Sequence, residues 1–501
     1  MHTDRRFIRP AATAAILGLA LTTGVFAAPV TLDLTPAAAA VEQAATIDFT
    51  RTGSITIHKR AGDDTETRAD GTEMDGVPGE PLDGVEYKLT LVQGYKTSAD
   101  VAKGQRMTLE EAQAATGGAV STGTTGPGGV VTFDNLPLGR YLVEEVSAPA
   151  GHVPGGPFLV SVPMTAPERT GWNYDVHVYP KNTVNAAEKA VVDAGKHTGD
   201  EITYTITSDI PTPAEGGLAK YEIVDDYDEN MVTVDPATIT AALDDGTALT
   251  PGEHFTAEAG ADGKVTVAFT AAGLTKLSEK ADARVVTTIP ATVLAIDGGE
   301  TVAEGEGTGG VVVPNTAQVI ANEGGGSADG VTETNTVETF FGKLLVEKTN
   351  DAGEALDGAK FELYDCANKD ELGDKISVAG QDTWTTVDGQ ASINALHVTD
   401  YADDAPAGPA KYCLVEVEAP EGYELLAEPV EVEFTREALG ASEGEGSADD
   451  AVTLVKKITN VGTTQPSLPL TGGMGIGILA ALGALIIGAG VWLAKRNGTK
   501  A

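Results

Sequence analysis

One stretch of the chain decides the fold: Tyr412-Cys413-Leu414-Val415-Glu416-Val417-Glu418-Ala419-Pro420-Glu421-Gly422-Tyr423. Side chains alternate across a β-strand, so Tyr412, Leu414 and Glu416 share one face. Pro420 and Gly422 then end the strand in a turn. The stretch therefore predicts a strand with a glutamate on its apolar face, where an isolated charge is unfavourable.

The strands expected on either side of this stretch carry a matching lysine and asparagine. The opening strand, Gly342–Lys348, places Lys348 on its apolar face, and the closing strand, 452–460, places Asn460 on its apolar face. A lysine, an asparagine and the acid of Glu416 are thus expected to meet in one core.

The same three residue types recur in the same order near the start of the chain, which indicates an internal repeat. A strand at 54–59 turns Lys59 inward, and Glu145 lies on the apolar face of the segment 140–152. The segment 172–182, WNYDVHVYPKN, turns Asn182 inward and its neighbour Lys181 outward.

The region between the two repeats is richer in Thr, Asp and Gly and offers an aspartate in place of the glutamate. Lys189 lies near its start, Asp225 shares a strand face with Tyr221 and Ile223, and Asn315 lies within an alternating apolar run. The residue pattern leaves Lys196, Asp226 and Asn322 open as substitutes.

A lysine, an asparagine and a carboxylic acid in a dry core can react with one another. Burial disfavours charge, so it lowers the lysine pKa and raises that of the acid. The neutral amine can attack the asparagine carbonyl while the acid shuttles protons and ammonia leaves. Alternatively, the lysine reaches solvent, the asparagine caps its strand and the acid forms a salt bridge. We predict three intramolecular isopeptide bonds: Lys348–Asn460 with Glu416, Lys189–Asn315 with Asp225, and Lys59–Asn182 with Glu145.

Composition supports a secreted β-rich protein. The 501-residue chain has a formal net charge of −41, and such an acidic surface repels nucleic acid and anionic membranes. From about Thr46 the sequence consists of short β-rich runs separated by Gly, Pro, Asp and Thr, which is typical of sandwich domains. One short helix is expected at Thr108–Ala115, with Glu111 completing a capping box, and no long helical periodicity precedes the C-terminal apolar run.

We therefore predict an all-β protein of three tandem immunoglobulin-like β-sandwich domains. Acidic loops are expected at 298–310 and 441–450, and a short tether at 465–467. The expected boundaries are 1–27 for a signal peptide, 46–182 for the first domain, 183–341 for the middle domain, 342–461 for the third domain, and 462–501 for a linker, sorting motif, transmembrane helix and basic tail.

Both ends carry targeting signals. A basic start and an apolar segment from Ala11 to Val25 are typical of a secretory signal peptide. At the other end, an uncharged apolar run from 473 to 494 is long enough to span a bilayer, and a basic tail follows it. Everything before this run is expected outside the cell. The motif LPLTG stands directly before it: Leu468, Pro469, Leu470, Thr471 and Gly472.

Two cysteines, Cys366 and Cys413, both fall in the third domain. On an exported protein they are expected to form a disulfide, the alternative being two buried free thiols. Two cysteines and seven scattered histidines give no metal site, and no cofactor is expected. Catalytic signatures such as G-x-S-x-G or a phosphate loop are absent from the sequence, which argues against a surface enzyme.

Three motifs resemble those of a known family. The stretch 412–423 resembles the E-box of collagen-adhesin B-type domains; the first domain's version differs in the apolar pair and in having His152 for the last tyrosine. WNYDVHVYPKN looks like the pilin motif of Gram-positive shaft pilins, and LPLTG with its apolar run resembles a sortase sorting signal. The resemblance implies a major pilin assembled by a class C sortase, with first and third domains of the collagen-adhesin B type.

The resemblance also implies roles and partners. Lys181 would attack the sortase-bound Thr471 of another copy, and a housekeeping sortase would attach the finished fimbrium to peptidoglycan in the cell wall. Other partners would be tip or minor pilins and a host or bacterial receptor that the sequence does not identify. In this family the first-domain bond is sometimes absent or forms after polymerisation. The alternative function is a wall-anchored monomeric adhesin in which Lys181 is idle.

Overall fold

A computed structural model gives the structure of the protein and describes residues 46–62, 69–169, 171–213, 216–260, 262–296, 309–408, 410–440 and 452–463. The predicted signal peptide, the acidic loop at 441–450, the tether and the whole sorting signal lie outside the described residues. No helix within these ranges has the length and apolar character needed to span a bilayer.

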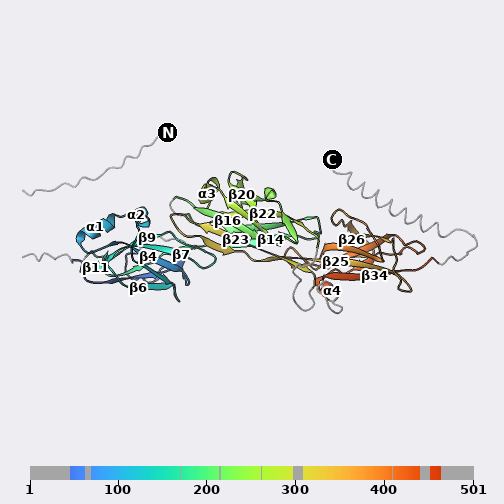
Figure 1. Cartoon of the computed structure of the whole chain (residues 1–501), viewed down its shortest axis with the longest axis horizontal. Helices are drawn as coiled ribbons and strands as arrows, with labels where there is room; N and C mark the ends of the chain where they lie inside the picture. Colours follow the sequence, from blue (N-terminus) through green and yellow to red (C-terminus); the bar gives the residue numbers. More distant parts are fainter. Residues whose placement is uncertain are drawn as a thin grey trace, which may run out of the picture. The chain divides into compact units, whose positions relative to one another are not determined.

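Strands dominate the described chain and form three β-sandwiches, so the all-β prediction is confirmed (Figure 1). We call β1–β13 the first sandwich, β14–β24 the middle sandwich and β25–β34 the third sandwich. Each has an apolar core between two sheets, because alternate residues of its strands turn inward. Val153 of β8 and Phe341 of β25 also join the middle core.

The first sandwich packs the sheet β5-β4-β7-β9 against strands β12-β1-β6 and β3-β2-β13-β8. Strands β1 and β2 follow one another with only Lys59 between them, and β2 runs parallel to β13. Its elements are β1 (Gly53–His58), β2 (Arg60–Ala61), β3 (Glu80–Pro81), β4 (Glu86–Gly94), α1 (Ser98–Arg106), α2 (Leu109–Gln113), β5 (Val120–Thr124), β6 (Val130–Leu136), β7 (Gly139–Ser147), β8 (His152–Val153), β9 (Phe158–Val162), β10 (Met164–Thr165), β11 (Trp172–Asn173), β12 (Asp175–Val178) and β13 (Lys181–Val184).

The middle sandwich packs β14-β15-β22-β18-β19, with β17 on β22, against β20-β21-β16-β23 and β24. Strand β23 also pairs with β25, so this second sheet continues into the third sandwich. Its elements are β14 (Ala187–Val192), β15 (Glu201–Asp209), β16 (Lys220–Asp226), β17 (Val232–Val234), η1 (Pro236–Thr238), β18 (Thr240–Leu243), β19 (Ala248–Leu249), β20 (Phe255–Ala259), β21 (Lys264–Phe269), α3 (Ala271–Ser278), β22 (Arg284–Val293), β23 (Val311–Asn322) and β24 (Gly330–Glu333).

The third sandwich packs β29-β25-β34 against β27-β26-β32-β33, with β28 on β26. Its first and last strands, β25 and β34, run parallel side by side. Its elements are β25 (Val337–Asn350), β26 (Lys360–Asn368), β27 (Glu371–Lys375), β28 (Trp384–Thr385), β29 (Gln390–His397), β30 (Tyr401–Ala402), β31 (Ala405–Pro406), β32 (Lys411–Glu418), β33 (Val430–Val432), α4 (Arg436–Gly440) and β34 (Thr453–Asn460).

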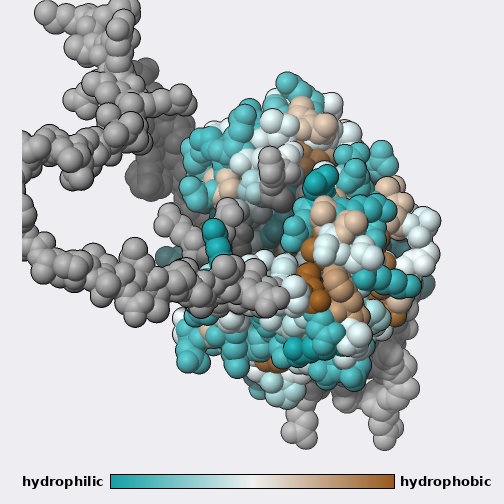
Figure 2. All heavy atoms as spheres, turned by 90° about the vertical axis from the view of Figure 1, so that its left-hand side faces the viewer, coloured by the Kyte–Doolittle hydropathy of each residue, from teal (hydrophilic) through white to brown (hydrophobic). Residues whose placement is uncertain are grey.

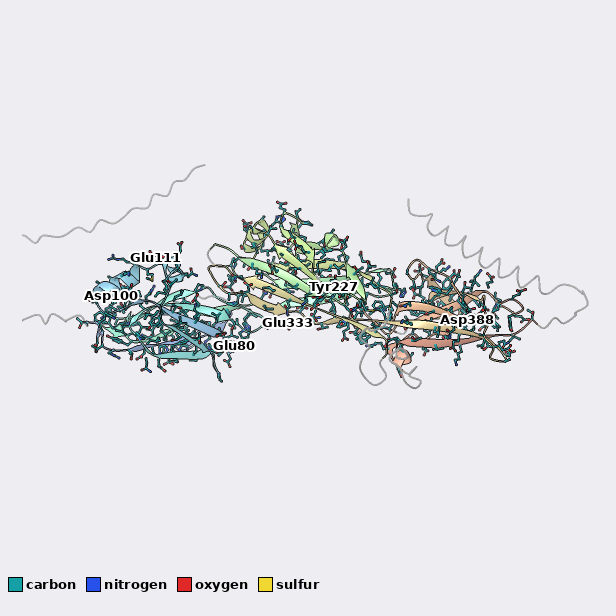
Figure 3. The ribbon with its side chains drawn as sticks, in the orientation of Figure 1. Glu80, Asp100, Glu111, Tyr227, Glu333 and Asp388 are labelled. Atoms are coloured by element: carbon teal, nitrogen blue, oxygen red, sulfur yellow. A yellow bond between two sulfur atoms is a disulfide. The ribbon has the colours of Figure 1, made fainter. Side chains whose placement is uncertain are left out.

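The expected helix near Thr108 is present as α2, with the predicted capping box between Thr108 and Glu111. The expectation of a single short helix is wrong, because α1, α3 and α4 also form. Helix α1 packs on β4 and β7 and begins with a second capping box, between Thr97 and Asp100. Figure 3 labels both acidic capping residues, Asp100 and Glu111. Only two residues of α1 are buried, so apolar periodicity could not reveal it.

The predicted disulfide is confirmed: Cys366 of β26 and Cys413 of β32 are joined on adjacent strands, with a Cα–Cα distance of 5.9 Å. Both residues are buried. The described part of the face seen in Figure 2 is mostly hydrophilic, with hydrophobic residues in small patches.

Replacing both cysteines, as Cys366→Ala with Cys413→Ala, should destabilise the third sandwich. Closing a loop of 47 residues restricts the unfolded chain and stabilises by roughly 4 kcal/mol in the chain-entropy model. Differential scanning calorimetry should therefore show a lower melting temperature for one transition only. Wild-type protein under reducing conditions is the control and should shift in the same way; an unchanged melting profile in the double variant would contradict the expectation.

Candidate functional site: three buried lysine clusters

The predicted lysine, asparagine and acid of the third sandwich meet in its core. Lys348 Nζ contacts Asn460 Oδ1 and lies 3.6 Å from Glu416 Oε1. Asn460 Nδ2 donates to both carboxylate oxygens of Glu416, at 2.9 and 3.0 Å, and the Leu426 amide donates to Oε2 at 2.8 Å. All three side chains of the cluster are buried. The acid therefore touches the amide nitrogen and lies next to the amine.

The first sandwich builds a similar cluster. Lys59 Nζ contacts Asn182 Oδ1 and donates to Glu145 Oε2 at 2.7 Å, while Asn182 Nδ2 donates to Glu145 Oε1 at 2.5 Å. The Gly155 amide donates to Asn182 Oδ1 at 2.9 Å. This close approach suits glycine, because a Cβ at Gly155 would lie 3.0 Å from a backbone oxygen. The amide is placed to stabilise negative charge that develops on the oxygen.

The middle sandwich brings together Lys189, Asp225 and Asn315. Lys189 Nζ contacts Asp225 Oδ2 and donates to Asn315 Oδ1 at 2.7 Å. All three residues are buried. Unlike the other clusters, the acid and the amide nitrogen do not pair: Asp225 Oδ1 and Asn315 Nδ2 have no hydrogen-bond partner among the residues described.

The substitutes considered for the middle cluster lie elsewhere. Lys196 follows β14 in a turn, and Asp226 is exposed and lies 3.4 Å from Lys264. Asn322 donates to Asp329 Oδ1 at 2.9 Å and closes the turn after β23.

The clusters differ in how they span the two sheets. In the third sandwich, the lysine and the asparagine lie on neighbouring parallel strands of one sheet, and the glutamate lies on the facing sheet. In the first sandwich, the lysine lies between β1 and β2, next to the strand of the asparagine, and the glutamate again lies on the facing sheet. In the middle sandwich the lysine lies on β14 of one sheet, while the aspartate and the asparagine lie on β16 and β23 of the other. A covalent bond would therefore join neighbouring chain segments of one sheet in the first and third sandwiches. In the middle sandwich it would join the two opposite sheets.

Burial shifts Lys189 and Lys348 toward the neutral amine. Desolvation lowers the pKa of Lys189, and the nearby Asp225 only partly offsets it. Desolvation likewise lowers the pKa of Lys348 against the opposing effect of Glu416. A lowered pKa increases the fraction of neutral amine, which is the nucleophilic form.

A shared backbone device holds the first and third lysines, and sequence reasoning missed it. The Lys59 amide donates to the Gly129 carbonyl and the Lys348 amide to the Gly389 carbonyl, each at 2.7 Å. Both glycines have positive φ, +72° and +73°, so a side chain there would be strained. A repeated sequence could have revealed this contact: LDGV at 82–85 and LDGA at 356–359. The aspartate of each segment accepts a hydrogen bond from the amide of the corresponding glycine.

Each buried amine also faces an aromatic ring that the sequence analysis did not single out. The lysine Nζ lies 5.8 Å from the ring centroid of Tyr87, 5.0 Å from that of Tyr204 and 6.0 Å from that of Phe361. Tyr87 and Phe361 occupy the same place in the repeat, five residues after each buried leucine of LDG, and all three rings are buried. They keep water from the amines.

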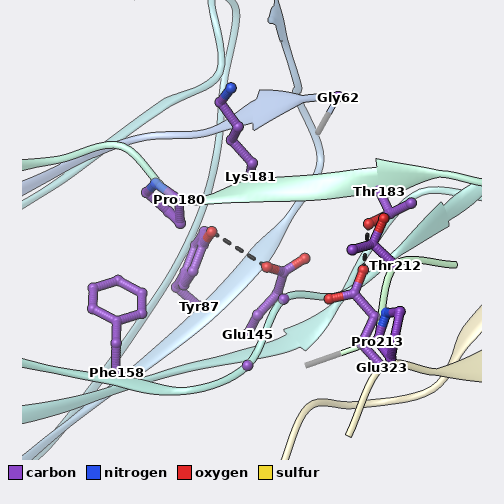
Figure 4. A pocket seen from close by; sticks show the side chains of 12 residues that line it. Gly62, Tyr87, Glu145, Phe158, Pro180, Lys181, Thr183, Thr212, Pro213 and Glu323 are labelled. Atoms are coloured by element: carbon purple, nitrogen blue, oxygen red, sulfur yellow. Dashed lines mark hydrogen bonds between the residues drawn. The ribbon is translucent and has the colours of Figure 1, made fainter. Parts of the chain in front are cut away.

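Lys181 stands next to the first cluster. It is half-buried on β13, whereas the following residue, Asn182, is fully buried. Lys181 lines a cavity of about 270 Å³ together with Tyr87, Glu145 and Phe158. In Figure 4 its side chain points away from Glu145, whose carboxylate accepts a 3.4 Å hydrogen bond from Tyr87.

The residues before Lys181 fix the start of β13. Tyr179 stacks on His58, with ring centroids 4.6 Å apart, and its hydroxyl accepts from the Met74 amide at 2.6 Å. The other half of the predicted linkage, Thr471, lies outside the described residues with the rest of LPLTG. Within the described ranges, no group of three or more His, Cys, Asp and Glu could hold a metal ion.

Comparisons with known proteins agree with this arrangement. Residues 50–183 match the family described as Gram-positive pilin subunit D1, N-terminal domain, and residues 342–443 match a prealbumin-like fold domain. Fimbrial subunit type 1 of Actinomyces viscosus is 31% identical over 535 residues, which cover 96% of this chain and 97% of that protein.

Two solved structures share the fold. The full-length major pilin SpaD of Corynebacterium diphtheriae is 37% identical with a TM-score of 0.68, and the match covers 84% of this chain and all of that one. The major pilin SpaA of the same organism, described as a modular assembly with stabilising isopeptide bonds, is 25% identical with a TM-score of 0.60. That match covers 82% of this chain and all of the SpaA chain.

In an Asn460→Ala variant, the free energy of unfolding should depend on pH, because the Lys348 amine stays buried and unreacted. Lys348 stays buried, and its pKa is lower in the folded state than its ordinary value of 10.5. The unfolded chain then binds more protons in the window between these values, so the free energy of unfolding should rise as pH increases toward 10.5. Urea denaturation between about pH 7 and pH 9.5 measures this.

Adding Lys348→Met to Asn460→Ala provides the control, because the titrating amine is gone. The double variant should lose most of the increase in stability with pH. Equal pH dependence in the two variants would show that Lys348 is not its source.

Proposed function

This chain belongs to the family of Gram-positive major pilins and fimbrial subunits, and from that membership we propose how its copies are joined and stabilised. It is a structural subunit of a surface pilus, and its relatives are exported, cell-surface fimbrial proteins rather than enzymes. In the proposal, Lys181 of one copy is linked covalently to Thr471 of another, and Lys–Asn bonds stabilise each sandwich.

The observation that carries the proposal is the pairing of Lys181 and Asn182 on β13. Asn182 is buried against Lys59 and Glu145, whereas Lys181 lines a cavity at the protein surface. This arrangement supports a reaction of Asn182 within its own sandwich and of Lys181 with another molecule.

The intermolecular step is a transpeptidation. A class C pilus sortase breaks the bond between Thr471 and Gly472, and the amine of Lys181 takes over the threonine carbonyl. The same exchange with a peptidoglycan amine, by a housekeeping sortase, anchors the last subunit to the cell wall. Tip or minor pilins complete the fimbrium, which mediates adhesion.

The intramolecular steps need no second protein. Each neutral lysine attacks the side-chain carbonyl of its asparagine. The acid moves a proton from the amine to the asparagine Nδ2, which leaves as ammonia. Support comes from the contacts between lysine Nζ and asparagine Oδ1 in all three clusters. Each reaction occurs once per molecule, so the chain modifies itself and does not turn over a substrate.

Lys181→Ala should abolish the covalent fibre, because no amine remains to accept the threonine. Boiled in SDS and separated on a gel, extracts of wild-type cells should show a ladder of high-mass species that collapses to one band in the variant. Thr471→Ala should give the same collapse.

Lys196→Ala is the matched control, since it removes a lysine of similar exposure only 15 positions along the sequence. Its ladder should equal that of wild type. Monomer alone in the wild-type extract would contradict polymerisation and favour a wall-anchored monomeric adhesin.

Intact mass spectrometry should show the internal bonds directly. After correction for the two hydrogens lost in the disulfide, the exported chain should be lighter than its sequence by one ammonia per bond. Glu416→Ala should leave the third bond unformed and restore one ammonia, because proton transfer to the leaving nitrogen is lost. Glu418→Ala, at the exposed end of the same strand past a register shift, is the control and should keep the wild-type deficit. A full sequence mass for the wild type would exclude these bonds.

A further inference from the structure

The middle cluster lacks one contact that the other two possess. In the first and third sandwiches, the glutamate accepts a hydrogen bond from the asparagine Nδ2, so one carboxyl group touches or adjoins both the amine and the leaving nitrogen. Asp225 has a side chain one methylene shorter and contacts the amine of Lys189 through Oδ2. Its other oxygen and Asn315 Nδ2 are both buried without a partner among the described residues.

A third polar atom at the same place is also unpartnered. The hydroxyl of Tyr204 is buried and, in the part of the chain that the structure describes, has no hydrogen-bond partner. A buried hydroxyl without a hydrogen-bond partner is unfavourable. Three unpaired polar atoms around one reactive amine therefore call for an explanation beyond packing.

Strand register places Tyr204 beside the reacting groups. Lys189 on β14 is directly opposite Ile206 on β15, so Tyr204 is its diagonal neighbour on the same inward face. Lys189 Nζ lies 5.0 Å from the centre of the Tyr204 ring.

The electrostatics agree with this position. Burial raises the pKa of Tyr204 above its usual value, and the charge of Asp225 raises it further. The Asn315 side chain lowers the pKa of Tyr204 and so lies near its hydroxyl. The two groups do not form a well-aligned hydrogen bond in this geometry. The tyrosine therefore keeps its proton at neutral pH.

We propose that the Tyr204 hydroxyl delivers the proton to Asn315 Nδ2 when the middle isopeptide bond forms, taking the place of the second carboxylate oxygen of the glutamate in the other sandwiches. The inference rests on the proposed function, because it assigns a residue to one of the three internal reactions.

The proton balance closes without an added reagent. The neutral amine of Lys189 forms a bond to Asn315 Cγ and passes one proton to Asp225. The Cγ–Nδ2 bond breaks as Tyr204 gives its proton to Nδ2, and ammonia leaves. Asp225 then returns the lysine proton to the tyrosine, so both side chains end as they began.

The aromatic residues at the corresponding places in the other sandwiches agree with a proton-donor role that is confined to Tyr204. Phe361 has no hydroxyl, and there Glu416 already contacts the leaving nitrogen. Tyr87 has a hydroxyl, but it donates to Glu145 at 3.4 Å, and Glu145 itself contacts Asn182 Nδ2. Only the aspartate-containing cluster needs a separate donor.

Tyr204→Phe tests the proposal, because it removes one oxygen and keeps the ring. The full chain is made in a pulse of cell-free synthesis, and peptides linked through Lys189 and Asn315 are quantified over time by mass spectrometry. We expect the middle bond to form about a hundredfold more slowly than in wild type, within the usual range for general acid catalysis. The bonds of the other sandwiches should form at wild-type rates.

Two further variants separate chemistry from structure. In a Lys189→Ala background, Tyr204→Phe should not lower the melting temperature of the middle sandwich, because it removes a hydroxyl that makes no hydrogen bond. Asp225→Glu added to Tyr204→Phe should restore at least part of the rate, because the longer acid reaches Nδ2 as glutamate does elsewhere. Tyr221→Phe is the matched control, because its hydroxyl pairs with Ser208 and the Asp209 carbonyl outside the cluster, and it should leave the rate of the middle bond at the wild-type value.

A wild-type rate for the middle bond in Tyr204→Phe would overturn the role of Tyr204 and leave the proposed function intact. A slow rate accompanied by a lower melting temperature in the Lys189→Ala background, with no rescue by Asp225→Glu, would assign the effect to structure and overturn it as well. Absence of the Lys189–Asn315 linkage from wild-type protein would remove the bond and the role together.

Discussion

Burial of a lysine amine beside a carboxyl and a carboxamide is the interaction on which the rest of this molecule depends. A lysine taken out of water is unfavourable unless its charge is compensated or lost. Each sandwich meets this demand in the same way, with an acid and an asparagine oxygen on the amine and an aromatic ring beside it. The surrounding apolar strands exclude water, and the same exclusion favours the neutral form of the amine, which is the nucleophilic form. Stability of the core and the proposed reactivity of the cluster would thus have one cause.

Strand alternation was enough to predict the first and third clusters. In both, the lysine, glutamate and asparagine stand on apolar faces of short strands, and a period of two determines which face each residue occupies. The middle cluster could not be predicted to one residue of each kind, because Asp225 and Asp226 are adjacent and either could have faced inward. Their assignment depends on how β16 pairs with β21 and β23. The helix α1 was missed for a related reason, since its capping residues and not its apolar pattern mark where it begins.

The positions around the clusters escaped prediction because their roles depend on tertiary contacts. Gly129 and Gly389 accept from the lysine backbone across long stretches of sequence, and their positive φ cannot be read from the neighbouring residues. The aromatic rings read in the sequence as ordinary core residues. What distinguishes Tyr204 from Phe361 is one unpaired hydroxyl, and the sequence does not show that the neighbouring aspartate leaves the amide nitrogen unpaired as well.

The adjacency of Lys181 and Asn182 has a mechanical consequence once the proposed bonds are in place. Tension would enter a subunit at Lys181 and leave it towards the C-terminus, so residues 46–180 would form a side branch that bears none of it. In the two later sandwiches the bonds bridge sequence separations of 126 and 112 residues, and the folded chain between their ends would be bypassed. The first sandwich could therefore unfold and refold, or vary in sequence, without lengthening the fibre. Its own Lys–Asn bond would stabilise a side domain and would carry none of the tension along the fibre.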